Sequence, residues 1–183
     1  MRTGYVLTLG ETMGLYSAQR TGELHLGDSY RFSVGGTESN LAIGLARLGT
    51  PSTWVGRVGH DEVGRVIART LRAEGVNAHV IVDAGAPSAV MTRGRRLPGR
   101  ASVSYFRSGS AGSRLRPADV PRSLISEAAL LHVTGITPAL SDTARQTVQK
   151  SVLTAHELGV PVSIDINYRA RLWSPGAAVE VLT

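Results

Sequence analysis

The chain has 183 residues, enough to bury a substantial core, and an ordinary share of apolar residues. It has no cysteine, which excludes a disulfide framework and a thiolate metal site, and no apolar run of signal-peptide or transmembrane length, so we expect a cytoplasmic protein with no membrane partner. Its formal net charge of +6 comes almost entirely from scattered arginines without interleaved aromatic residues, so we expect no nucleic-acid partner.

The first half of the chain alternates strand and helix patterns. The apolar run Tyr5–Leu9 predicts a buried strand, and the alternating stretches 12–18 and 30–34 predict half-buried strands. Further elements are a helix over 39–48 with Leu48 on its apolar face, a buried strand over 53–58, and a helix over 62–74 that Asp61 caps. We weighed Asp61 as a ligand or base but favour the cap, which satisfies it locally.

The middle of the chain has a different character. Short strand patterns over 78–82, 88–92 and 102–107 are separated by Gly/Pro turns, with no long helix between them. They predict an antiparallel patch, a flap beside the main sheet. Strand and helix patterns then return, with a strand over 130–134, a helix over 142–158 and a buried strand over 162–166. Such alternation favours an α/β fold with a mostly parallel sheet flanked by helices.

The diglycine Gly35-Gly36 precedes the first helix and is the most informative local pattern. Residues 37–40, Thr37-Glu38-Ser39-Asn40, are of types that open helices, and helix N-termini attract oxygen-rich or anionic ligands. The alternative is a tight turn into a helix with no ligand. The ends of parallel strands also carry polar residues, and ligands bind at that edge of such sheets. There Glu11 either lines a cleft or is solvated, and Asp165 either orients Asn167 or Arg169 or bonds to the loop backbone.

Five segments taken together resemble the ribokinase-like (PfkB) carbohydrate kinases, and most closely the 2-keto-3-deoxygluconate kinases. They are residues 35–40 with 46–49, 58–64, 105–115, 131–137, and 165–169 with 172–173. The resemblance implies a ribokinase-like fold, with the flap at about residues 12–34 and 78–107. It covers the N-terminal part of one such domain. The catalytic aspartate loop and the nucleotide-binding part are expected beyond Thr183, so no catalytic base is assigned within the sequence.

The resemblance also implies site residues and partners. The implied substrate contacts are Gly35, Gly36, Thr37, Glu38, Ser39, Asn40, Tyr105, Phe106, Arg107 and Arg169. The implied contacts at the junction with the nucleotide are Asn167, Tyr168 and Arg169, with Arg169 also able to stabilise charge during phosphoryl transfer. ATP and Mg2+ are the implied cofactors, with Mg2+ arriving on the nucleotide and no protein metal site, since no histidine pair has ligand spacing. A homodimer or higher homo-oligomer through the flap is expected.

Two arginines facing one cavity suit a sugar acid better than a neutral sugar, because a guanidinium binds a carboxylate through a planar pair of donors. The alternative is that Arg107 and Arg169 are solvated surface side chains with no role in ligand binding. Met91 stands where these kinases often have a flap tyrosine, which bears on the exact substrate. We therefore predict phosphorylation of 2-keto-3-deoxygluconate or a close sugar acid. The alternatives are a sugar-binding fragment or pseudo-kinase without phosphotransfer, and a fructose or nucleoside kinase.

Overall fold

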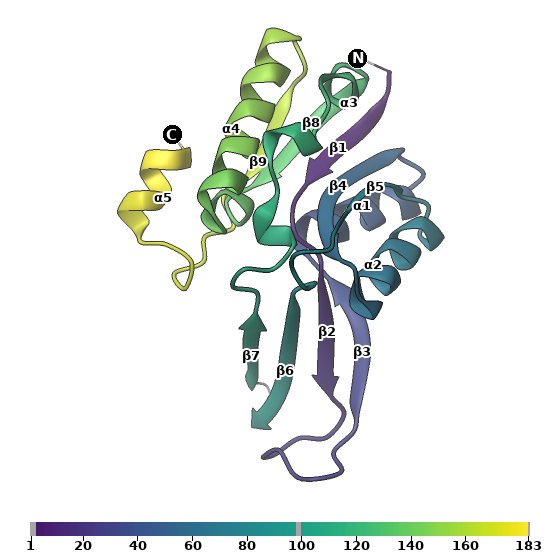
Figure 1. Cartoon of the computed structure of the whole chain (residues 1–183), viewed down its shortest axis with the longest axis vertical. Coiled ribbons are helices and arrows are strands. Elements are labelled where there is room, and N and C mark those ends of the chain that lie inside the picture. Colours follow the sequence, from purple (N-terminus) through teal and green to yellow (C-terminus); the bar gives the residue numbers. More distant parts are fainter. Residues whose placement is uncertain (1–2, 98–99, 183) are drawn as a thin grey trace.

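Two β-sheets form the framework of the molecule (Figure 1). The computed structural model describes residues 3–97 and 100–182, so residues 98 and 99 of the expected flap lie outside the described residues. The larger sheet contains β1 (Tyr5–Leu9), β4 (Ser52–Gly59), β5 (Asn77–Asp83), β8 (Ala128–Thr134) and β9 (Val162–Asp165). The smaller sheet contains β2 (Met13–Ala18), β3 (Tyr30–Gly35), β6 (Val90–Leu97) and β7 (Arg100–Phe106).

The larger sheet packs against α1 (Thr37–Arg47), α2 (Glu62–Ala73), α3 (Arg122–Ser126) and α4 (Asp142–Glu157). Helix α5 (Pro175–Leu182) follows the loop after β9, and short 3-10 turns are η1 (Gly112–Arg114), η2 (Pro117–Asp119) and η3 (Thr137–Ala139). No helix among the described residues is long and apolar enough to cross a bilayer.

The larger sheet is entirely parallel, in the order β5-β4-β1-β8-β9. The chain builds outward from β1 to one side and then returns to add β8 and β9 on the other. In such sheets the crevice beside the central strand, at the carboxyl ends, is where ligands bind. The predicted α/β fold, with a mostly parallel sheet and a small second sheet, is confirmed.

Each face of the parallel sheet has its own core, because successive strand residues point to opposite sides. Trp54 and Val58 of β4 pack with Ala42 of α1 and with Ile67 and Leu71 of α2. On the opposite face Leu7, Leu9, Val55, Leu131 and Val133 pack with the inner sides of α3 and α4. The sheet is therefore the middle of three layers, and its carboxyl-end edge is rigidly held.

Two predictions about the flap are wrong. The segment at 78–82 belongs to β5 of the larger sheet, because α2 is the crossover helix that joins two parallel neighbours, β4 and β5. The small sheet is mixed rather than antiparallel, in the order β3-β2-β6-β7, since β6 runs parallel to β2. It extends away from the layered body (Figure 1).

Two element details also differ from prediction, and a third agrees with it. Helix α1 begins at Thr37 and ends at Arg47, and Leu48 is 82% exposed because it lies past the last helical turn rather than on the buried face. Strand β9 is not buried: Val162 and Ile164 are exposed, since β9 is an edge strand. Asp61 is the N-cap of α2 as predicted, and its carboxylate accepts from the backbone N–H groups of Gly64 and Ser88, both at 2.7 Å.

Candidate functional site

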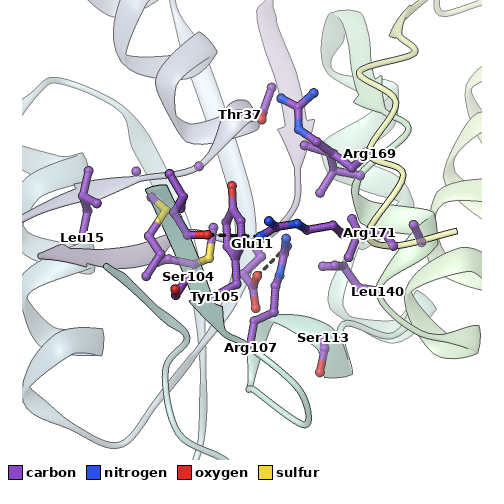
Figure 2. Close-up of a pocket in the computed structure, with 18 of the residues that line it drawn as sticks. Glu11, Leu15, Thr37, Ser104, Tyr105, Arg107, Ser113, Leu140, Arg169 and Arg171 are labelled. Atoms are coloured by element: carbon purple, nitrogen blue, oxygen red, sulfur yellow. Dashed lines mark hydrogen bonds and ion pairs between the residues drawn. The ribbon is translucent and has the colours of Figure 1, made fainter. Parts of the chain in front are cut away.

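A cleft of about 1250 Å³ lies between the two sheets, at the carboxyl ends of β1, β8 and β9. The small sheet contributes Leu15, Val34, Met91 and several residues of β7, and the larger sheet contributes the residues that follow its strands. Figure 2 shows three arginines, Arg107, Arg169 and Arg171, around this cleft. A cleft with cationic walls and a glycine-lined floor is a candidate site for a polar, anionic small molecule.

The diglycine allows the start of α1 to approach the β1–β2 connection. Gly36 is the N-cap residue, and a Cβ there would lie 2.4 Å from the carbonyl oxygen of Glu11. No side chain caps the helix, so the expected capping by Thr37, Ser39 and Asn40 is wrong. Residues 35–38 and Asn40 line the cleft, whereas Ser39 turns inward and donates to the carbonyl oxygen of Gly36.

Glu38 joins α1 to the end of β8. Its carboxylate oxygen Oε1 accepts hydrogen bonds from Thr134 and Thr137, each at 2.6 Å. Gly10 leaves room for this carboxyl, since a Cβ there would lie 2.5 Å from Glu38 Cδ. Burial raises the pKa of Glu38, and the two threonine hydroxyls oppose part of that rise. Glu38 therefore forms the floor of the cleft and is already hydrogen-bonded there.

Arg107 follows β7 and reaches the cleft beside a buried carboxylate. Its Nη2 lies 2.7 Å from Glu11 Oε2, and Glu11 Oε1 accepts from the hydroxyl of Ser110. The guanidinium also lies 5.7 Å from the ring centroid of Tyr105, which lines the cleft. Phe106, one residue along the strand, does not line the cleft and is exposed, because neighbouring strand residues point to opposite faces. Glu11 lines the cleft, which decides between its two predicted environments.

The loop after β9 supplies the other two arginines of the cleft, Arg169 and Arg171. Asn167 adopts a positive φ of 37°, its N–H donates to Asp165 Oδ1, and its Nδ2 donates to Thr37 Oγ1 at 3.3 Å. Asp165 thus bonds to the loop backbone, one of the two roles predicted for it. Arg169 lines the cleft, while Asn167 and Tyr168 do not, and the Tyr168 hydroxyl donates to the carbonyl oxygen of Trp173.

Sequence reasoning missed Arg171, the third arginine of the cleft. Its Nη1 donates to the carbonyl oxygen of Val103 on β7, 3.2 Å away, so it links the loop after β9 to the small sheet. Residues 169–172 form a turn closed by the hydrogen bond from the Leu172 N–H to the Arg169 carbonyl oxygen, so neither strand nor helix spacing in the sequence pointed to Arg171. Met13 and Ser104 also line the cleft and were not predicted.

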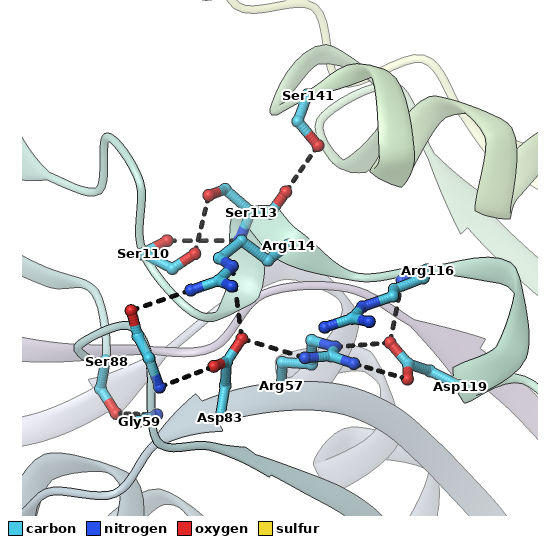
Figure 3. Close-up of polar contacts among 11 residues, drawn as sticks. Arg57, Gly59, Asp83, Ser88, Ser110, Ser113, Arg114, Arg116, Asp119 and Ser141 are labelled. Atoms are coloured by element: carbon cyan, nitrogen blue, oxygen red, sulfur yellow. Dashed lines mark hydrogen bonds and ion pairs between the residues drawn. The ribbon is translucent and has the colours of Figure 1, made fainter.

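A buried ionic network supports the segment that carries Ser110 (Figure 3). Arg57 of β4 pairs with Asp119 through Nε and Nη2, at 2.6 and 2.9 Å, and with Asp83 at 3.0 Å. Arg114 also lies 3.4 Å from Asp83. The network therefore anchors η1 and η2 to the parallel sheet. Among the described residues, no group of three or more histidine, aspartate or glutamate side chains is arranged to hold a metal ion.

Known proteins match this chain along nearly all its described length. Residues 3–183 match the family of pfkB carbohydrate kinases. A 2-dehydro-3-deoxygluconokinase of Thermoproteus tenax is 40% identical over 178 residues, which cover 96% of this chain and 54% of that protein. A 2-dehydro-3-deoxygalactonokinase of Haloferax volcanii is 34% identical over 177 residues, covering 96% and 56%.

The fold matches as well. The crystal structure of a 2-dehydro-3-deoxygluconokinase from Thermotoga maritima superposes with a TM-score of 0.91 at 30% identity, covering 99% of this chain and 56% of that one. The ribokinase-like fold is therefore confirmed. The chain spans about half the length of these relatives. The family match over residues 3–183 and the shared fold show that the chain belongs to the PfkB family of carbohydrate kinases.

Proposed function

We propose that the protein is an ATP-dependent kinase for a 2-keto-3-deoxy sugar acid, with 2-keto-3-deoxygluconate (the 2-dehydro-3-deoxygluconate of the relatives) as the first candidate. The observation that carries the proposal is the convergence of Arg107, Arg169 and Arg171 on one cleft. A neutral sugar offers these groups only hydroxyls, whereas a sugar acid offers a carboxylate that a guanidinium binds through two parallel hydrogen bonds. The relatives named for 2-dehydro-3-deoxy sugar acids agree with this substrate class.

The start of α1 is proposed to bind the sugar hydroxyls. Thr37 and Asn40 line the cleft and each offers a donor and an acceptor. Gly35 and Gly36 allow the backbone to come close, and Tyr105 closes the cleft from the small sheet. These contacts would hold the sugar in one orientation, which is the positioning part of phosphoryl transfer.

Phosphoryl transfer also needs a base, a nucleotide site and positive charge at the transferring group. Both carboxylates that line the cleft within the described residues are engaged, Glu11 with Arg107 and Glu38 with two threonines. The base is therefore proposed to come from another part of the protein. Asn167, Tyr168 and Arg169 are proposed to face the nucleotide, and Mg2+ to arrive with ATP. An oligomer through the small sheet is proposed on the resemblance alone, and a cytoplasmic location on the lack of cysteine and of an apolar run of signal-peptide length.

The test is a coupled assay of ADP release by the full-length protein. The substrates are 2-keto-3-deoxygluconate, 2-keto-3-deoxygalactonate, fructose, ribose and a nucleoside. We expect turnover of a sugar acid, and Arg169→Ala should raise the KM for that acid by about tenfold or more, as for loss of a charged hydrogen bond. Arg65→Ala, on the exposed face of α2, is the matched control. Turnover of fructose or the nucleoside alone would refute the sugar-acid proposal.

A second candidate function concerns the 183-residue chain by itself. Because neither cleft carboxylate is free, this chain is proposed to bind a sugar acid without transferring phosphate. Isothermal calorimetry should then detect binding of 2-keto-3-deoxygluconate, with no ADP formed in the presence of ATP. Measurable kinase activity of the 183-residue chain would contradict this.

A further inference from the structure

Glu11 is a buried carboxylate to which the proposed function gives no chemical role. It follows β1 directly and is only 3% exposed, yet it lines the cleft. One of its oxygens lies 2.7 Å from Nη2 of Arg107, and the other accepts from Ser110. Glu11 is thus ion-paired through Oε2 and hydrogen-bonded through Oε1, although Oε2 accepts no hydrogen bond of good geometry among the described residues.

The surrounding backbone is shaped to this side chain. A Cβ at Gly112 would lie 2.4 Å from Glu11 Cγ and 2.7 Å from Glu11 Oε1. A Cβ at Gly36 would lie 2.4 Å from the Glu11 carbonyl oxygen. The helix start and the η1 turn therefore both close on Glu11, and glycine is needed on each side of it.

The η1 turn is itself held in place by side chains. The hydroxyl of Ser113 donates to the carbonyl oxygen of Ser110 at 2.7 Å, and the hydroxyl of Ser141, the N-cap of α4, donates to the carbonyl oxygen of Ser113. Figure 3 shows this chain of contacts, which leads from Ser110 to α4. Glu11 thus sits between fixed elements on both sides.

The stability of the folded protein does not by itself explain a buried ion pair between Glu11 and Arg107. Replacing a buried ion pair with well-packed apolar groups is often neutral or stabilising, because both charges lose their hydration. Burial raises the pKa of Glu11, which reports the same cost, although Arg107 and Ser110 oppose part of the rise. What the pair does accomplish is to hold one long, flexible side chain in a single place. Within its own segment the guanidinium has the Tyr105 ring 5.7 Å away, whereas the adjacent Phe106 and Ser108 are exposed, so the ion pair with Glu11 is its firmest contact.

We infer that Glu11 is a positioning residue that orients the Arg107 guanidinium toward the carboxylate of a sugar acid. The inference rests on the proposed function. A guanidinium donates from three nitrogens, so the pair at Nη2 leaves Arg107 able to bind a second carboxylate. Ser110 in turn holds the far oxygen of Glu11. Substrate selection thus depends on a residue that follows the first strand and need not touch the sugar.

The sign of one measurement separates positioning from simple electrostatics. Glu11 is an anion at the wall of a cleft that takes an anionic substrate, so as a bystander it would repel that substrate. Its removal in Glu11→Gln would then lower the KM for the sugar acid. If Glu11 positions Arg107, Glu11→Gln should instead raise the KM for the sugar acid. Arg107 would then be less well oriented and would bind the carboxylate less well, even though a repelling charge is gone.

The experiment is steady-state kinetics of the full-length protein with the sugar acid and ATP. We expect Glu11→Gln to raise the KM for the sugar acid about tenfold, as for a misplaced binding group, with kcat and the KM for ATP within about twofold of wild type. Glu11→Asp keeps the charge but is one methylene shorter, so it should also raise that KM. Glu62→Gln is the matched control, since Glu62 pairs with Arg65 on the exposed face of α2.

An unchanged or lower KM for the sugar acid in Glu11→Gln would overturn the inference. If Glu11→Gln fails to fold, Glu11→Asp decides by the same criterion, and collapse of both variants would assign Glu11 a structural role instead. Failure of the proposed function looks different, because the wild-type protein itself would then turn over no sugar acid.

Discussion

Loss of the Asp119 charge should destabilise the protein far more than loss of a surface charge. Asp119 binds Arg57 through both carboxylate oxygens, at 2.6 and 2.9 Å, and both side chains are 8% exposed (Figure 3). In Asp119→Asn the side chain keeps its shape but loses its charge. Arg57 is then left in a buried position with Asp83, 3.0 Å away, as its remaining carboxylate partner among the described residues.

The magnitude follows from the burial of the pair. Removing one partner of a buried ion pair costs about 3–5 kcal/mol, because the other charge stays buried without compensation. Since Asp83 still compensates Arg57 in part, we expect the lower end, about 3 kcal/mol. The exposed pair of Glu62 and Arg65, with side chains 70% and 61% exposed, should contribute at most about 1 kcal/mol.

The assay is urea unfolding followed by tryptophan fluorescence. Trp54 is fully buried and lies on β4, the strand that carries Arg57, so it reports on the same region. Asp119→Asn should lower the free energy of unfolding by about 3 kcal/mol, and Glu62→Gln by less than about 1 kcal/mol. The double variant Arg57→Met with Asp119→Leu should recover much of the loss, because neither buried charge of that pair remains. A cost below about 1 kcal/mol for Asp119→Asn, equal to the surface control, would refute the reasoning.

Three further predictions follow from the same geometry. Gly36→Ala places a Cβ 2.4 Å from the carbonyl oxygen of Glu11 and should lower kcat/KM for the sugar acid at least about tenfold in the ADP-release assay. Gly44→Ala, whose Cβ would have nothing within 4 Å, is the control and should leave kcat/KM unchanged. Equal kcat/KM values for the two variants would contradict this. Asp61→Ala leaves two backbone N–H groups without their acceptor and should cost about 1–2 kcal/mol in urea unfolding; no measurable cost would contradict the cap. Burial alone would raise the pKa of Asp83, but a backbone N–H and two arginines outweigh burial, so the pKa of Asp83 is lowered in the folded protein. The Asp83 carboxylate therefore stabilises the folded state above about pH 4, and this stabilisation is lost as the pH falls through the pKa that Asp83 has in the folded protein. Urea midpoints from pH 7 to 3 should therefore fall less steeply in Asp83→Asn, and an identical slope would contradict the assignment.

Local features of this protein were predictable because they depend on neighbours in the chain. Asp61 caps α2 since the Gly64 N–H that donates to it is only three residues away, and the Asp165 carboxylate accepts from the backbone N–H two residues ahead. The alternation of apolar runs and amphipathic helices indicated a parallel sheet, and the segments singled out at 35–40 and 165–173 contribute residues to the wall of the cleft.

The wrong predictions concern features that distant residues decide. Periodicity shows that 77–83 is a strand but not which sheet it joins, and pairing with β4 depends on where α2 packs. Strand β9 has an apolar sequence, yet its exposure depends on its place at the edge of the sheet. Phe106 and Ser39 belong to segments that border the cleft but do not line it themselves. A sequence motif identifies the segment, whereas the local backbone conformation decides which of its side chains face the cleft.

The amino-acid sequence by itself determined the α/β class, most of the elements and the segments that surround the cleft, because hydrophobic period, caps and turn residues act over a few positions. Only the tertiary structure decided which side chains meet. Glu11 and Ser110 are 99 positions apart, Arg57 and Asp119 are 62 apart, and Arg171 reaches Val103 across 68. No pattern of neighbouring residues in the sequence connects the two members of such a pair. They come together because parallel strands bring their carboxyl ends to one edge, and the small sheet borders the cleft at that edge.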